Sequence, residues 1–229
     1  AMPEALEQLR IATTLADSLV KTEPDNTLWA DIGADVNAFY GEVAFRLGDL
    51  KLASDAAARS CALAQDLVKR DASVVRWRGF HLSRCQSLQA ALAAHAGDHD
   101  GALERSREVV ARIDALKPAD REGDQPIRWQ LGIALLATGD ELRVMNRFDE
   151  ARAAWERVVA VLGPQQERED AAMQTVLAAA LLRLGRAGEA APIVAKWERA
   201  GYAHPDFIAI KTRDEQPAFV SYGRPSPAH

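Results

Sequence analysis

Residues 45–60, FRLGDLKLASDAAARS, have the pattern of one helix ending, a sharp corner, and a second helix beginning. Gly48 and Asp49 mark the corner, because glycine commonly ends helices and aspartate commonly caps the start of the next one. Ala53 and Ala57 follow four residues apart, on one face of the second helix, where small side chains allow another helix to approach closely. The stretch therefore predicts a tightly packed helical hairpin.

This corner recurs along the chain at nearly regular intervals. The alanines that open the second helix of each hairpin are separated by 48, 49, 49 and 39 residues, and they are Ala5, Ala53, Ala102, Ala151 and Ala190. A small residue lies twelve positions before each of the last four, namely Gly41, Ala90, Gly139 and Ala178. Small side chains at both positions allow the two helices of a hairpin to cross closely, so the sequence predicts an all-α fold built from repeated hairpins.

Helical signals fill almost the whole chain, since apolar and polar residues do not alternate over any sustained stretch. Glycine, proline, asparagine and aspartate mark the breaks between helices. They predict about nine to ten helices, at residues 4–22, 26–47, 50–70, 74–96, 99–116, 126–145, 148–162, 167–184 and 187–199, with a short one at 205–211. The polar segment 117–126, KPADREGDQP, is a predicted loop.

The same breaks divide the chain into regions. Residues 1–3 are interpreted as a cloning remnant and leader, 4–200 as the repeat domain, 201–213 as a C-terminal capping segment and 214–229 as a flexible tail. The expected repeat units are 4–22 (partial), 26–70, 74–116, 126–162 and 167–199. Because the first unit is a second-type helix without its partner, we expect the natural protein to continue upstream.

The small residue in the first helix, the corners LGD, AGD, MNR and LGR, and the alanine that opens the second helix together resemble tetratricopeptide (TPR) repeats over residues 4–200. The usual period is about 34 residues. Here it is near 49, and EALEQLRIATTLADSLVKTEPDNTLW is similar to a long-repeat bacterial variant of the family. Gln86 and Gln89 depart from the pattern, since large apolar residues are more usual there. The resemblance implies a right-handed α-solenoid of antiparallel hairpins.

The resemblance also implies which side chains line a concave groove, four from each of four first-type helices. They are Asp35, Ala38, Glu42 and Arg46, then Arg84, Ser87, Ala91 and His95, then Ile133, Leu136, Asp140 and Arg143, and finally Ala172, Thr175, Ala179 and Arg183. Such a wall is charged at intervals with small apolar gaps, and it lacks a concentrated Lys and Arg clamp. An extended or helical peptide is the expected ligand.

Several other functional classes are not expected. A net charge of −5 argues against binding to nucleic acid, and no apolar run is long enough to span a membrane. His95 and His99 are separated by the helix break at Gly97 and Asp98, so we expect no metal site there and no cofactor. Neither a phosphate-binding loop nor a strained nucleophile turn is present, and we expect no enzymatic activity.

The sequence leaves the state of its two cysteines open. Cys61 and Cys85 lie twelve residues to either side of Ser73, which falls in a predicted turn. In an antiparallel hairpin the two would lie at similar height and could form a disulfide, but rotation about each helix could also separate them. The alternative for Cys85 is a small buried hydrophobic side chain.

The ending ERAGYAHPDFIAI is similar to the close of TPR regions in bacterial multidomain signalling proteins, where a kinase or a DNA-binding module comes first. With the repeats, it implies a scaffold from the C-terminal part of a larger bacterial signalling or regulatory protein, one that binds a peptide or a partner protein. The alternative is an effector-sensing domain that binds a small molecule or peptide and regulates the upstream module.

Two expectations concern the setting of the domain. Self-association through the exposed N-terminal repeat is expected, because that repeat has no preceding neighbour to cover it. The compartment is left open: the cytoplasm is favoured, and the periplasm or the cell exterior is the alternative if an upstream membrane span exists.

Overall fold

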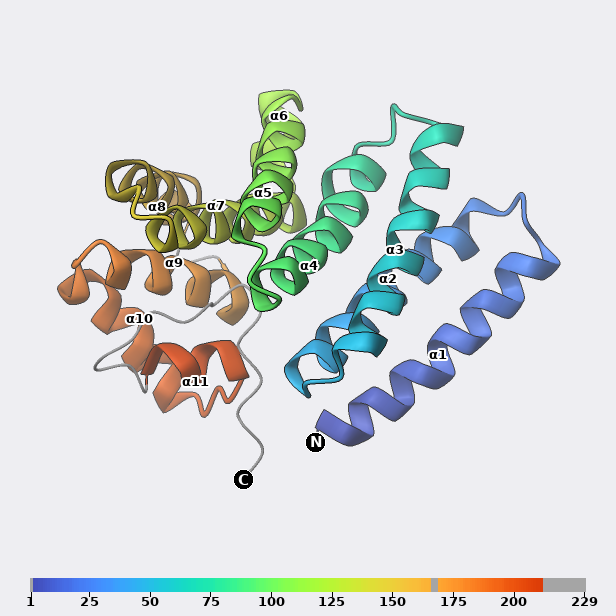
Figure 1. The fold of residues 1–229 in the computed structure, drawn as a ribbon, viewed down its shortest axis with the longest axis horizontal. Helices are drawn as coiled ribbons and strands as arrows, with labels where there is room; N and C mark the ends of the chain where they lie inside the picture. The colour runs from blue at the N-terminus through green and yellow to red at the C-terminus, as the bar shows by residue number, and fades with distance from the viewer. Residues whose placement is uncertain (1, 166–168, 212–229) are drawn as a thin grey trace.

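The computed structural model describes residues 2–165 and 169–211, and within them it contains helices and no strands, which confirms the all-α class (Figure 1). The helices are α1 (Met2–Thr22), α2 (Thr27–Arg46), α3 (Leu50–Arg70), α4 (Leu82–His95), α5 (His99–Asp114), α6 (Pro118–Gly123), α7 (Gln125–Val144), α8 (Phe148–Leu162), α9 (Ala171–Arg183), α10 (Ala187–Arg199) and α11 (Pro205–Lys211). A π-helix spans Trp77–His81, and a 3-10 turn spans Gly163–Gln165. The predicted flexible tail, 214–229, lies outside the described residues. No described helix is long and apolar enough to cross a membrane.

Two local features differ from the sequence prediction. The described residues hold eleven α-helices rather than nine or ten, because α6 forms inside the predicted polar loop. Pro118 occupies its first turn, where the missing proline N–H leaves no hydrogen bond unmade. The helix predicted at 74–96 is not uniform, since the π-helix precedes α4. Gly79 lies within that π-helix, where an added Cβ would come 2.9 Å from Ile127 and 3.0 Å from Leu116.

Four corners between the paired helices share one backbone geometry. The residue that ends the first helix has a positive φ in each case: 83° at Gly48, 83° at Gly97, 60° at Asn146 and 73° at Gly185. The next residue donates its backbone N–H to the carbonyl five positions earlier, as Asp49 does to Ala44 at 3.0 Å. This hydrogen bond is the signature of a Schellman helix end. Asparagine tolerates the left-handed conformation better than most non-glycine residues, so the predicted corner at Asn146 is confirmed with the other three.

The helices form two layers, and the chain passes repeatedly from one to the other. Each first-type helix (α2, α4, α7 and α9) packs against the second-type helix that follows it (α3, α5, α8 and α10). The first-type helices also contact one another in sequence, so they form an inner layer. Figure 1 shows the hairpins following one another from α1 to α10 around a curved path. The fold is therefore repeat-like, while its TPR relationship and right-handed solenoid geometry stay predictions.

Small residues are located where helices cross. A Cβ added to Gly41 would lie 2.7 Å from Leu88 and 3.2 Å from the backbone oxygen of Ala53. A Cβ added to Gly139 would lie 2.3 Å from the indole nitrogen of Trp155. The later alanines of the series are fully buried, namely Ala53, Ala102, Ala151 and Ala190, whereas Ala5 is exposed on α1. Close crossing at the later hairpins, which the sequence predicted, is confirmed.

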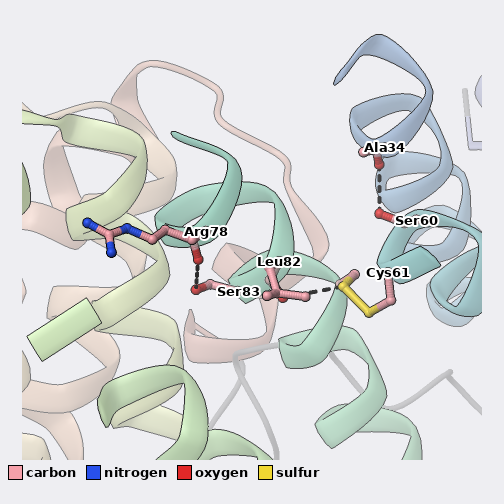
Figure 2. The surroundings of a disulfide bond; sticks show 7 residues. Ala34, Ser60, Cys61, Arg78, Leu82 and Ser83 are labelled. Carbon is pink, nitrogen blue, oxygen red and sulfur yellow. Dashed lines mark hydrogen bonds between the residues drawn. A yellow bond between two sulfur atoms is a disulfide. The ribbon is translucent and has the colours of Figure 1, made fainter. Parts of the chain in front are cut away.

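Cys61 of α3 and Cys85 of α4 form a disulfide, with their Cα atoms 5.4 Å apart. The yellow bond in Figure 2 joins the two helices, and beside it Ser60 donates a hydrogen bond of 2.7 Å to the carbonyl of Ala34. Both cysteines are buried, so Cys85 is a buried side chain as well as a bonded one. The bridge connects one hairpin to the next.

We expect Gly139→Ala to lower the free energy of unfolding by about 1–3 kcal/mol, because the added methyl group would overlap the Trp155 side chain. Gly188→Ala is the matched control: it lies in α10 with nothing within 4 Å of its added Cβ, and it should leave stability unchanged or slightly higher. Urea denaturation measures both. Equal effects of the two substitutions would contradict the close crossing at Gly139.

Reduction of the disulfide should lower the free energy of unfolding by about 3 kcal/mol, because the bridge closes a loop with a sequence separation of 24 residues and restricts the unfolded chain. Urea denaturation with and without reductant measures the difference. The Cys61→Ala/Cys85→Ala double variant should be insensitive to reductant, and a parent chain that is equally insensitive would show that the bridge does not contribute.

Candidate binding site

Arg84 lies at the centre of the inner layer and is 1% exposed. Its Nε and Nη2 atoms donate to the two carboxylate oxygens of Glu42 at 2.7 and 2.9 Å, and its Nη1 donates to Asp35 at 2.7 Å. Two parallel bonds from a guanidinium to one carboxylate form a strong and orientation-specific contact. The structure thus brings three of the predicted groove residues, from α2 and α4, into one ion-pair network.

Aromatic rings cover this buried charge. The Arg84 guanidinium carbon lies 3.6 Å from the centre of the Phe39 ring, 5.7 Å from that of Phe80 and 5.9 Å from that of Trp129. At these distances the negative face of a ring attracts a cation. Phe39 remains 44% exposed. Sequence reasoning missed Phe39 as a site residue, although its position four residues after Asp35 places both on one helix face.

The Glu42 carboxylate stays charged although it is buried. Burial works to raise its pKa, but the charge and hydrogen bonds of Arg84 outweigh burial and hold the pKa below the ordinary value of 4.5. The pair is therefore ionic at neutral pH. Removing one partner would leave the other charge buried and uncompensated, which typically costs about 3–5 kcal/mol.

A second ion pair joins the two ends of the domain. Arg46 at the end of α2 donates to Asp206 of α11 at 3.0 Å, across 160 positions of sequence. Figure 1 shows the end of α2 and the helix α11 at the same lower edge of the molecule. Phe207 beside this pair is fully buried. The C-terminal segment therefore folds back against the first complete hairpin.

A third pair repeats the chemistry between α7 and α9. Arg183 binds both carboxylate oxygens of Asp140, with Nη2 to Oδ2 at 2.7 Å. The indole of Trp155 donates to the same carboxylate at 3.2 Å. Asp140 follows Gly139 as Glu42 follows Gly41, so an acidic side chain comes directly after a small crossing residue in both hairpins.

Two cavities lie on either side of Phe39 and Trp129, which line both. The first, called here the covered cavity, has a volume of about 270 Å³ and lies between α2, α7, α9 and residues 202–206. The second, called the open cavity, has a volume of about 230 Å³ and lies among α2, the π-helix and the beginnings of α7 and α9. Ile133, Ala172 and Thr175 of the predicted groove line the covered cavity.

The remaining predicted groove residues differ in their exposure. Five are buried among the helices: Ala38, Ser87, Ala91, Leu136 and Ala179. Arg143 is half-buried, and burial lowers the pKa of its guanidinium. His95 is exposed, and its ring meets that of Phe45 edge-on with centroids 5.8 Å apart. The binding role of the predicted wall stays a prediction.

The corner HAGDHD separates its polar side chains. His99 Nδ1 lies 2.8 Å from Glu141, and Asp98 accepts the backbone N–H of Gly101 as the cap of α5. His95 faces Phe45 instead. Over residues 2–165 and 169–211 no group of three or more His, Cys, Asp or Glu side chains is placed to hold a metal ion.

No family model matches this chain, and no curated protein matches it. The crystal structure of BtubC (BKLC) from P. vanneervenii is similar over 95% of both chains, at 16% sequence identity and a TM-score of 0.43. A likeness of this degree carries no argument about function.

The ion pair of Glu42 should make stability depend on acidity. Because its pKa is lower in the folded protein than the ordinary value of 4.5, its stabilisation is present above that pH and is lost as the pH falls below it. Urea midpoints measured from pH 6 downwards should fall less steeply for Glu42→Gln than for the parent chain. Glu104→Gln, at an exposed position of α5, should keep the parental slope, and a parental slope in Glu42→Gln would contradict the assignment.

Proposed function

We propose that this protein is a non-enzymatic interaction module that binds a peptide segment of a partner protein across its inner helix layer. The observation that carries the proposal is the exposed ring of Phe39, which lies between two cavities and above the buried Arg84. Aromatic anchors beside pockets are typical of the energetic centres of protein interfaces.

The charges of the inner layer support a peptide ligand with apolar anchors. Glu42 and Asp35 are paired with Arg84, and Asp140 is paired with Arg183, so these groups compensate one another. What the open cavity offers is mainly aromatic surface, with the exposed Arg76 at its rim. The Arg76 guanidinium lies 4.9 Å from the Phe80 ring centre. An apolar side chain of the peptide would enter the cavity, and Arg76 would favour an acidic neighbour in the peptide and fix its register.

The wider setting belongs to the same proposal. The repeated corners and buried small residues support a TPR-like scaffold, and the C-terminal resemblance supports a place in a larger bacterial signalling or regulatory protein. Self-association through the N-terminal repeat is also proposed. Ile11 and Leu15 support it, because both are exposed on α1.

Selection of random dodecapeptides on the immobilised protein tests the peptide surface. Phe39→Ala should abolish enrichment of peptides that bind the parent chain, because it removes the aromatic anchor between the cavities. Phe148→Ala is the matched control, since Phe148 is 61% exposed on α8 and should not affect binding. Arg76→Ala should reduce the preference for acidic residues beside the apolar anchor. Identical enrichment by the parent chain and Phe39→Ala would overturn the proposal.

Charge reversal at Arg84 is not a suitable test of binding. Its side chain is buried and bonded to two carboxylates, so a glutamate there would place three acidic groups together and disrupt folding. Phe39 is exposed enough to be replaced with a smaller effect, and urea denaturation of Phe39→Ala confirms that the variant used is folded.

A further inference from the structure

The covered cavity has apolar walls supplied by three inner helices. Val43 of α2, Ile133 of α7 and Val176 of α9 line it together with the rings of Phe39 and Trp129. Its volume of about 270 Å³ lies just below the range of about 300–1,000 Å³ that is usual for pockets holding drug-sized ligands. The occupant that fits is therefore a small molecule with one or two rings.

The cover of this cavity is a compact aromatic cluster. The Tyr202 ring stacks on His204 with an interplanar angle of 9° and centroids 5.9 Å apart. Tyr202 also packs against Trp197 at 5.8 Å and against the fully buried Phe207 at 5.5 Å. The Arg46–Asp206 ion pair connects this cluster to α2. The cover is thus anchored in the core on one side and joined to α2 by an ionic contact on the other.

The charged groups that line the cavity are compensated. Glu42 is bonded to Arg84, and Arg46 is bonded to Asp206. Burial lowers the pKa of His204 below 6.5 and raises the pKa of Tyr202 above 10.0, so both rings of the cover are neutral at pH 7. A charged ligand would bring an uncompensated charge into this apolar space, at a cost of several kcal/mol. The walls therefore favour an uncharged occupant.

We propose that the covered cavity is a binding site for a small uncharged aromatic molecule, which enters when the Tyr202–Asp206 segment separates from α2. This site goes beyond the peptide surface, because its ligand lies beneath the C-terminal segment and not in the open cavity. Occupancy would stabilise the closed arrangement of α2 and α11. That coupling gives the domain a way to respond to an effector, which is the alternative expected from the sequence.

Four probes with similar rings test the ligand class: indole and phenol, which are uncharged, and benzoate and benzylammonium, which are charged. The uncharged probes should raise the thermal unfolding midpoint in a saturable manner and shift the indole ¹H–¹⁵N resonance of Trp129, assigned with Trp129→Phe. Their apparent affinity should exceed that of the charged probes at least tenfold. Equal binding of charged and uncharged probes, or no binding by indole and phenol up to their solubility limits, would overturn the proposal.

Ala172→Leu tests the location, because the larger side chain would fill the covered cavity and should abolish the response to indole. Ala153→Leu is the matched control, since Ala153 lines a different cavity between α5 and α8 and the response should persist. If Ala172→Leu fails to fold, Ala172→Met serves in its place. An unchanged indole response in the folded Ala172 variant would contradict the site. Peptide selection on the same variant should be unaffected, which separates this result from a failure of the peptide surface.

Discussion

The buried guanidinium of Arg84 is the group on which the arrangement of the inner helix layer depends. A charge removed from water must be compensated, and here the compensation comes from two carboxylates of α2 and from rings of α2, the π-helix and α7. Each partner is useful only in one relative position of the helices. The ion-pair network therefore selects how the first two hairpins pack and places Phe39 above it, between the two cavities.

Small residues make this network geometrically attainable. Gly41 and Gly139 allow the helices of their hairpins to approach closely, and Glu42 and Asp140 follow them directly in sequence. Each carboxylate then binds an arginine of the next inner helix, Arg84 or Arg183. Charges that would otherwise face a ligand become internal contacts. The inner layer consequently offers aromatic surface and neutral cavities, which suits apolar anchors better than charged ones.

The disulfide and the Arg46–Asp206 pair add two connections that a simple stack of hairpins does not require. Cys61–Cys85 joins consecutive hairpins, and Arg46–Asp206 joins α2 to α11. The second contact closes the covered cavity and makes the C-terminal segment part of the inner surface. A change at one end of the domain can thus alter the other end directly, without passing through every repeat between them.

The sequence by itself determined the all-helical class, the corners and most helix ends, because capping and left-handed termination depend on a few neighbouring residues, as at Gly48 and Asn146. It did not reveal α6 or the π-helix, whose formation is not marked by composition or periodicity. The positions of Glu42, Arg84 and Asp140 were also predictable, but their pairing was not. Ion pairs, the disulfide and both cavities depend on the rotation of each helix about its axis and on contacts between distant segments, and only the tertiary structure decides these.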